Sequence, residues 1–239
     1  MTARAFLTGQ GGRFLEIANN VLKYYLRNVR FITGTAYAGK STMVRMLAER
    51  CGAIACGENY HMAASDVVAD PELQPNLCYF RRMKDWQEFL NRTPEEYEAW
   101  IYDSSREAAA FEIAELIRLS ADGIVVADTN LPLDVLHEIA DPHQVAVMLS
   151  PQSMSVERFF DRADPEKRFL FEQIEQAADP VATMANFRAC IARVNSPEHY
   201  AEYVSSGFFT ITRREEAGDT REATLRALAA HFGMTVCDE

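Results

Sequence analysis

Long apolar runs and closely spaced cysteine pairs are both missing from this chain of 239 residues. No apolar run approaches the roughly 18 residues of a membrane-spanning helix, and residues 1–12 lack the apolar core of a secretion signal. The five cysteines form no Cys-x-x-Cys pair and are odd in number, which favours small buried thiols in a reducing compartment over a disulfide framework. We therefore expect a soluble cytoplasmic protein with no membrane segment.

Positive charge is scarce as well. The chain carries 24 Lys and Arg residues against 35 Asp and Glu residues, which gives a net charge of −11. Because a nucleic-acid backbone is bound by clustered Lys and Arg, this balance argues against a nucleic-acid partner, and basic residues that meet phosphate must be placed locally. The hydrophobic content of 48% can fill a sizeable core, and the length fits one α/β domain with insertions.

The strongest positive signal is a glycine-rich segment between an apolar strand and a helix. It consists of Gly34, Thr35, Ala36, Tyr37, Ala38, Gly39, Lys40, Ser41 and Thr42. Its glycines allow backbone N–H groups to turn inward around a triphosphate, and the helix that follows adds the positive end of its dipole. Lys40 can then reach the β- and γ-phosphates, and the Ser41 hydroxyl can ligate Mg²⁺. We interpret the segment as a phosphate-binding loop; the alternative is an ordinary surface turn.

The residues on both sides of this loop fit that interpretation, because a phosphate loop joins a buried strand to an amphipathic helix. Val29, Phe31 and Ile32 predict the strand. A helix is predicted from Lys40 to about Arg50, and its apolar side consists of Met43, Val44, Met46, Leu47 and Ala48.

Strand and helix patterns alternate along the rest of the chain, which predicts a doubly wound α/β fold. Residues 1–28 are predicted as a helical extension that packs on the sheet edge or contacts a second copy of the chain, and 29–239 as the main domain. Two insertions interrupt this domain, a helical one at 62–102 that could hold a substrate and a charged lid region at 151–180. Further strands are predicted at 53–56, 124–128, 144–149 and 207–212, and helices at 13–27, 104–120, 181–194 and 219–233.

The insertion at 62–102 has signals of its own. Residues 62–75 are predicted as a loop, and Thr93, Pro94 and Glu96 predict a capped helix start. Aromatic and basic residues between these segments either hold an anionic or aromatic acceptor or pack as core. They are Tyr79, Arg81, Arg82 and Trp86.

Polar residues follow two of the predicted strands at their carboxyl ends, where open parallel sheets bind ligands. Glu58, Asn59 and His61 follow the second strand and are candidates for the acceptor side of a site; the alternative is a solvated loop. Asp128 ends the third strand beside the phosphate loop, where it can hold Mg²⁺ directly or through water. The alternative role for Asp128 is to cap a helix that begins near Pro132.

Two arginines four residues apart, Arg158 and Arg162, follow the fourth strand on one predicted helix face. Surface ion pairs with neighbouring acidic residues are one role for them. Taken with the phosphate loop and the strand that ends in Asp128, they make the chain resemble the P-loop kinases of small molecules, the superfamily of nucleoside monophosphate, shikimate and gluconate kinases. The resemblance implies a three-layer P-loop NTPase fold with a parallel five-stranded sheet in the order 2-3-1-4-5.

The resemblance also implies functional residues and cofactors. Arg158 and Arg162 take the role of lid residues that close over the transferring phosphate, and Arg168 is a third candidate. Thr212 and Arg213, after the last strand, fall where such kinases hold the adenine. ATP and Mg²⁺ are the implied cofactors, and a small-molecule acceptor is the implied second substrate.

The chain departs from the named subfamilies after its third strand. It has no Asp-Gly-x-Pro-Arg motif, which nucleoside monophosphate kinases have. Glu58 resembles the glutamate base of deoxynucleoside kinases. Those kinases have Glu-Arg or Asp-Arg after the third strand, however, where this chain has Asp128-Thr129. We therefore expect a Mg²⁺-assisted, ATP-dependent phosphotransferase acting on a small molecule. Lys40 and the lid arginines would act on the phosphoryl group, and Glu58 or Asp128 on the acceptor hydroxyl. The alternative is a nucleotide-binding regulatory protein or an ATPase without an acceptor.

The paired arginines separate these functions, because a passive nucleotide binder has no charge to stabilise on a breaking bond. Arg158→Ala and Arg162→Ala should each lower turnover at least about tenfold, roughly 1.4 kcal/mol of barrier, with smaller effects on ATP binding. Steady-state kinetics and ATP titrations measure the two quantities. Unchanged turnover in both variants would make these side chains surface ion-pair partners.

Overall fold

Five strands form an all-parallel sheet in the computed structural model, which describes residues 17–157, 159–160, 165–214 and 218–237. The strands lie in the order β2-β3-β1-β4-β5, and each neighbouring pair is parallel. The predicted α/β class and the strand order 2-3-1-4-5 are confirmed. The strands are β1 Val29–Gly34, β2 Ile54–Cys56, β3 Val125–Asp128, β4 Val145–Leu149 and β5 Phe209–Thr212.

The central strands are apolar runs because both faces of the sheet are covered. Every residue of β3 and of β4 is buried. Successive side chains of a strand point to opposite faces, so Phe31 joins one apolar cluster and the next residue, Ile32, joins the other. The sheet therefore lies between two separate layers of apolar contacts.

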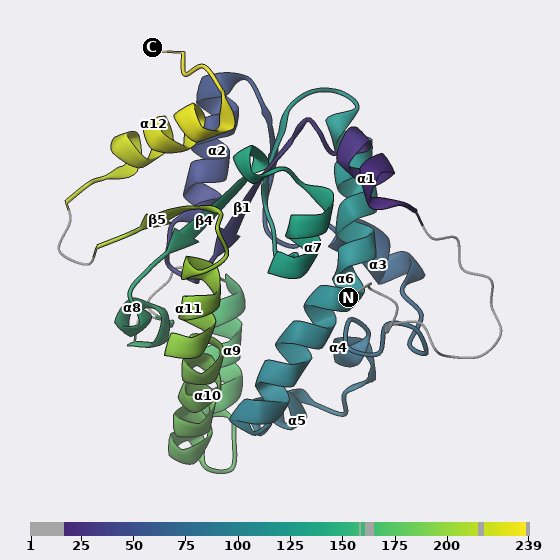
Figure 1. Ribbon diagram of the computed structural model, residues 1–239. Helices are drawn as coiled ribbons and strands as arrows, with labels where there is room; N and C mark the ends of the chain where they lie inside the picture. The colour runs from purple at the N-terminus through teal and green to yellow at the C-terminus, as the bar shows by residue number, and fades with distance from the viewer. Residues whose placement is uncertain (1–16, 158, 161–164, 215–217, 238–239) are drawn as a thin grey trace.

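Helices cover the two faces of this sheet (Figure 1). On one face, α2 (Lys40–Cys51) and α12 (Arg221–Phe232) pack through a shared apolar cluster. The 3-10 helix η1 (Pro142–Gln144) leads into β4. On the other face lie α1 (Asn19–Tyr25), the second half of α6 (Pro94–Ser120), α7 (Leu133–Ile139) and α11 (Pro197–Val204). The sheet and its two helical layers make a three-layer α/β/α arrangement.

The first half of α6 extends past the carboxyl ends of the strands. The last turn of α6 lies at the start of the sheet, where the Asn28 side-chain amide donates a hydrogen bond to the Ser120 carbonyl. Further back along the helix, Glu112 is already level with the end of β3, because the Thr129 hydroxyl donates to its carboxylate. At 1.5 Å per residue, the 27 residues of α6 span about 40 Å, which is much longer than a strand of this sheet.

This first half of α6 belongs to a group of helices that we call the helical body. Its other members are α4 (Tyr79–Arg82), α5 (Trp86–Leu90), α9 (Pro165–Glu175) and α10 (Pro180–Val194). Next to it, α3 (Met62–Val68) packs on α6 and α8 (Gln152–Glu157) packs on α10. Chain segments between β2 and β3 therefore pack against segments between β4 and β5 (Figure 1). The shared apolar cluster consists of Phe89, Leu90, Tyr97, Ile174, Phe187, Cys190 and Ile191.

Two predictions for the insertion are wrong. Residues 62–68 form α3 and not a loop, because the Ala63-Ala64 pair has the highest helix propensity of any residue type and Ser65 is buried. The capping box of Thr93 and Glu96 is present as predicted. The helix that starts there and the helix predicted at 104–120 are, however, one continuous helix. No glycine or proline interrupts residues 95–120, so the helix continues to Ser120. The predicted insertion boundary at residue 102 falls inside this helix.

The N-terminal helix is present but shorter than predicted, since residues 17, 18, 26 and 27 are described and lie outside it. The prediction covered residues 13–27, α1 occupies Asn19–Tyr25, and residues 13–16 lie outside the described part. None of the helices in the described ranges combines the length and the apolar character that crossing a membrane requires.

Two glycines with left-handed backbone angles differ in the space around them. Gly34 has φ +126°, and a Cβ added there would overlap the Met148 carbonyl oxygen; Gly52, which ends α2, has φ +66° and nothing within 4 Å. Gly52→Ala should cost about 1–2 kcal/mol from backbone strain. Gly34→Ala should cost clearly more, because β1 and β4 must also move apart. Chemical denaturation of the two variants measures the difference, and equal losses would contradict the close approach at Met148.

Candidate functional site

The phosphate-binding loop predicted at residues 34–42 connects the end of β1 to the first turn of α2. Gly34 and Gly39 have φ values of +126° and +91°, and Tyr37 between them has φ +64°. Gly39 directly precedes α2 and has no side chain to cap the N–H groups of the first turn. An anion at this position would therefore meet uncapped amides and the positive end of the helix dipole.

Groups in and after β4 hold the loop in this shape. The Thr35 N–H donates to the Met148 carbonyl at 3.1 Å, and Thr35 Oγ1 accepts from the Ser150 N–H at 2.8 Å. The hydroxyls of Ser150 and Ser155 both donate to the Ala36 carbonyl, at 2.5 and 3.1 Å. Because the carbonyl and the N–H of one trans peptide point in opposite directions, the amide that follows Ala36 is directed away from these serines.

Lys40, Ser41 and Asp128 meet at the start of α2. Lys40 Nζ lies 4.0 Å from Asp128 Oδ1 and donates to the Thr35 carbonyl at 3.2 Å. Ser41 Oγ donates to Asp128 Oδ2 at 2.8 Å. The parallel register that pairs Ile32 with Asp128 places the carboxylate beside the loop. Asp128 is 1% exposed, so its charge depends on nearby partners and not on water.

These atoms suit a hard divalent cation. A hydroxyl and a carboxylate supply oxygen ligands, which Mg²⁺ prefers, and Mg²⁺ commonly keeps several waters and takes further ligands from substrate phosphates. Among the described residues, no group of three or more His, Cys, Asp or Glu side chains could hold a metal. Ser41 and Asp128 could therefore provide part of a Mg²⁺ shell, which phosphate and water would have to complete.

A hollow of about 720 Å³ opens next to the loop. Its walls include Gly39 and Thr42 at the start of α2, and Thr212 and Arg213 at the end of β5. Arg213 Nη1 also donates to the Tyr37 carbonyl at 3.0 Å, which ties this wall to the loop. The structure thus brings the two residues that the resemblance assigned to adenine to a hollow beside the phosphate loop.

A buried carboxylate that the sequence analysis missed lies near the ends of β2 and β3. Glu112 of α6 is 1% exposed, and its Oε2 accepts hydrogen bonds from the Tyr60 and Thr129 hydroxyls, both at 2.7 Å. Burial raises the pKa of the Glu112 carboxyl against the effect of these hydrogen bonds. The signal that could have found it is a charged residue on the buried face of α6 that also carries Ala109 and Leu116.

Glu58, predicted as an acceptor-side base, is exposed and makes no hydrogen bond or ion pair with the described part of the chain. The reason is a turn in the backbone directly after it, where Asn59 has φ +61°. Beyond this turn, His61 is 7% exposed and the Tyr60 hydroxyl reaches Glu112. The residues that face inward after β2 are therefore Tyr60 and His61.

The predicted lid arginines are only partly described. Arg158 and Arg162 lie outside the described residues. Arg168 is exposed, and its Nε lies 3.3 Å from Glu172 Oε1 one turn along α9. That contact is a surface ion pair, which contributes little to stability.

The aromatic residues of the insertion pack as core, which was the alternative to an acceptor pocket. The Trp86 ring lies 5.0 Å from the ring of Phe169 in α9, centroid to centroid. The Arg92 guanidinium lies over the Tyr79 ring at 3.9 Å from its centroid. Arg81 donates to two backbone carbonyls at the end of α3. The aromatic contacts therefore lie within the helical body, and Arg81 ties α4 to the end of α3.

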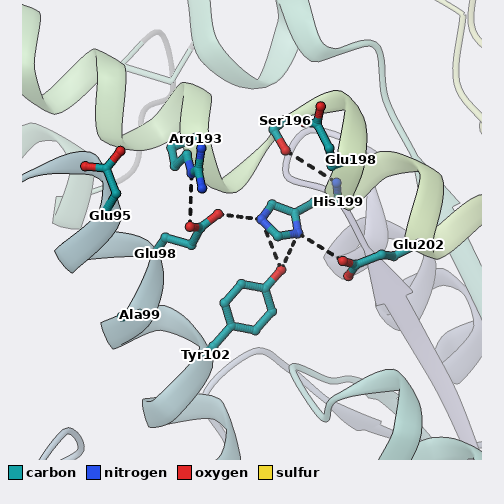
Figure 2. A pocket seen from close by; sticks show the side chains of 9 residues that line it. All are labelled: Glu95, Glu98, Ala99, Tyr102, Arg193, Ser196, Glu198, His199 and Glu202. Atoms are coloured by element: carbon teal, nitrogen blue, oxygen red, sulfur yellow. Dashed lines mark hydrogen bonds and ion pairs between the residues drawn. The ribbon is translucent and has the colours of Figure 1, made fainter.

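A second hollow, of about 460 Å³, lies between α6, α10 and α11 (Figure 2). The His199 ring is hydrogen-bonded to Glu98 Oε1 at 2.6 Å and to the Tyr102 hydroxyl at 2.5 Å, and Arg193 Nε donates to Glu98 Oε2 at 3.0 Å. Burial alone would raise the pKa of the Glu98 carboxyl, but the hydrogen bonds from His199 and Arg193 bring it below its ordinary value. These contacts tie α11 to the helical body, and the surrounding glutamates make this hollow a poor place for phosphate.

No protein-family model matches this sequence, and the comparison with curated proteins gives no match. The interpretation of the site therefore depends on its geometry and on the motifs of the sequence. That geometry is a glycine-rich loop at the start of α2, with Ser41 and Asp128 in contact beside it and a hollow on the side of β5.

Lys40→Ala should weaken ATP binding at least about tenfold, roughly 1.4 kcal/mol, because the variant loses a cation at the loop that would offset phosphate charge. Isothermal titration calorimetry with ATP and Mg²⁺ measures the affinity. Lys23→Ala is the matched control, since Lys23 lies on α1 and its Nζ pairs with the exposed Asp141 at 3.4 Å. The control should bind ATP as the wild type does, and wild-type affinity in Lys40→Ala would contradict the phosphate-loop interpretation.

Proposed function

We propose that this protein is an ATP-dependent phosphotransferase of the P-loop kinase type, which moves the γ-phosphoryl group of ATP to a small-molecule acceptor. The observation that carries the proposal is the meeting of Lys40, Ser41 and Asp128, with Ser41 Oγ 2.8 Å from the buried carboxylate. A lysine, a hydroxyl and a carboxylate in contact at a glycine-rich loop are the groups that phosphoryl transfer with Mg²⁺ requires. The cytoplasm, where ATP and Mg²⁺ are present, is the location that we propose.

In this proposal the nucleotide lies across the start of α2. Its phosphates would bind the N–H groups of residues 34–42, with Lys40 on the β- and γ-phosphates, and its adenine would lie in the hollow that Thr212 and Arg213 line. Ser41 and Asp128 would hold Mg²⁺, which supplies positive charge to the phosphates. The protein then acts mainly by positioning and by charge neutralisation.

The acceptor would bind at the same edge of the sheet, on the side of β2 and β3. Open parallel sheets bind ligands outside the carboxyl ends of their strands. In the strand order, β2 and β3 lie on one side of β1, while β5 and the hollow lie on the other. The two substrates could therefore approach the loop from opposite sides without competing for space.

A nucleotide-binding regulatory protein, or an ATPase without an acceptor, is the competing function. Incubation with ATP, Mg²⁺ and pools of hydroxylated metabolites, followed by mass spectrometry, distinguishes them. We expect a product that is heavier than one pool member by a phosphoryl group. ATP binding without any such product would favour the regulatory function.

Asp128→Asn tests the metal role, because it keeps the shape of the side chain and an acceptor for the Ser41 hydroxyl while removing the charge. The variant should fold and should lose at least about tenfold in turnover at a fixed Mg²⁺ concentration. ADP release during a Mg²⁺ titration measures the loss. The control is Asp134→Asn, since Asp134 is 62% exposed and pairs with Arg106 on the surface. Unfolding of Asp128→Asn alone would instead assign this carboxylate a structural role.

A further inference from the structure

The turn after β2 and the residues after β3 converge on Glu112. Its Oε2 accepts the Tyr60 and Thr129 hydrogen bonds, and its other oxygen, Oε1, lies 3.8 Å from His61 Nδ1. Tyr60 and His61 belong to the turn between β2 and α3, and Thr129 directly follows Asp128. One carboxylate therefore joins α6, the turn after β2 and the end of β3.

The two nitrogens of the His61 ring have different surroundings. The side chains of His61 and Glu112 are 8% and 2% exposed. Nδ1 is buried and has no hydrogen-bond partner in the described part of the chain, because its distance from the carboxylate is beyond hydrogen-bond length. Nε2 also makes no hydrogen bond with the described residues. Unlike Nδ1, however, it is not a fully buried atom. The nitrogen that a ligand can reach is therefore Nε2.

This ring lies at the same edge of the sheet as the phosphate loop. β3 separates β2 from β1, and neighbouring strands are about 4.8 Å apart, so the ends of β2 and β1 are about 10 Å apart. A small molecule can span that distance across the end of β3, from a phosphate at the loop to a residue in the turn after β2. The position of His61 thus fits a contact with the acceptor.

We propose that His61 is the general base for an acceptor hydroxyl and that Glu112 positions it. The inference rests on the proposed phosphotransferase function, and it replaces Glu58 and Asp128 as candidates for the base. A carboxylate that faces Nδ1 favours the ring form with the proton on Nδ1, and this form leaves Nε2 basic. A small shift of the ring would bring the 3.8 Å separation to hydrogen-bond length. The acceptor class is a small alcohol, such as a sugar, a polyol or an amino alcohol.

In the proposed step, the acceptor O–H bond breaks and its proton moves to His61 Nε2 as the acceptor oxygen bonds to the γ-phosphorus. The bond from the γ-phosphorus to the bridging oxygen breaks, and its electron pair leaves with the β-phosphate of ADP. His61 becomes an imidazolium that faces the Glu112 carboxylate. It returns the proton to solvent when the products leave.

The charges around the ring suit this role. Burial lowers the pKa of His61, and Asp66 of α3 raises it by less, so the ring is neutral at neutral pH. Glu112 faces the ring from α6, and Tyr60 packs edge-on against it from the same turn, with ring centroids 6.4 Å apart. Asp128 at the end of β3 acts on Glu112, whose pKa burial and this neighbouring charge both raise.

Three variants of the full chain test the assignment. His61→Asn keeps a polar group toward Glu112 but is no base, and Glu112→Gln keeps the shape without the charge. Glu115→Gln is the control on the same helix, since Glu115 pairs with the exposed Arg118. Calorimetry measures MgATP binding, and ADP release with pooled sugars, polyols and amino alcohols measures turnover from about pH 5 to pH 9. Thermal unfolding reports whether each variant is folded.

His61→Asn should lower kcat at least about a hundredfold while MgATP affinity stays within about twofold of wild type. It should also remove the decline of kcat/KM at acidic pH, which in the wild type reports protonation of the ring. Glu112→Gln should lower kcat about tenfold and move this decline to lower pH, because loss of the carboxylate lowers the pKa of His61. A purely structural role for Glu112 would not move the pH profile, and Glu115→Gln should match the wild type.

Turnover of His61→Asn within about threefold of wild type, with the acidic decline retained, would overturn the assignment and leave the phosphotransferase function intact. A wild-type protein that binds no MgATP or forms no phosphorylated product would overturn both. If Glu112→Gln does not fold, nitrogen NMR of the wild-type His61 ring decides the role of Glu112. A proton on Nδ1 supports the pair, and a proton on Nε2 refutes it.

Discussion

The Asp128 carboxylate is enclosed at the end of β3, and the strand order around it determines which groups can offset its charge. Because β3 lies between β2 and β1, this end of the strand borders the glycine-rich loop at residues 34–42 on one side and the turn after β2 on the other. Lys40 and Ser41 approach from the side of the loop. A buried carboxylate without such partners is strongly destabilising. These contacts therefore favour one arrangement of the loop, the first turn of α2 and β3.

A second carboxylate near the same strand end has a different environment. Asp128 contacts an ammonium group and a hydroxyl, whereas Glu112 accepts hydrogen bonds from two hydroxyls and from the backbone of Asn130, and its Oε1 lies 3.8 Å from the His61 ring. Burial and the neighbouring negative charge raise the pKa of Glu112. Pairs of carboxyl groups in unlike surroundings commonly divide the work of a site, one holding charge and the other acting in proton transfer. In the proposed function Asp128 would hold Mg²⁺, and Glu112 would act in proton transfer only indirectly, by positioning His61.

The parts of the site that could be predicted are those that depend on residues close together in the chain. The loop at 34–42 and the capping box at Thr93 are local patterns, and their spacing was enough to locate them. Glu112 could not be placed in this way, because Tyr60 and Thr129 lie 52 and 17 residues from it in the chain. The strand order was predicted from the resemblance to small-molecule kinases and not from the strands themselves. The exposure of Glu58 follows from the turn at Asn59, and the sequence alone did not show on which side of that turn the Glu58 side chain would lie.

α6 joins the helical body to the sheet as one continuous helix, and this constrains the number of residues between its two points of attachment. Tyr97 is fixed in the apolar cluster of the body and Glu112 is fixed at the end of β3, and the helix between them spans about 22 Å at 1.5 Å per residue. One added or deleted residue would rotate the body by about 100° relative to the sheet. Only insertions of about seven residues, which add two full turns, would leave Tyr97 facing the apolar cluster and Glu112 facing the end of β3. Each such step would move the helical body about 10 Å further from the strand ends, so the residue count of one helix sets the distance between the body and the sheet.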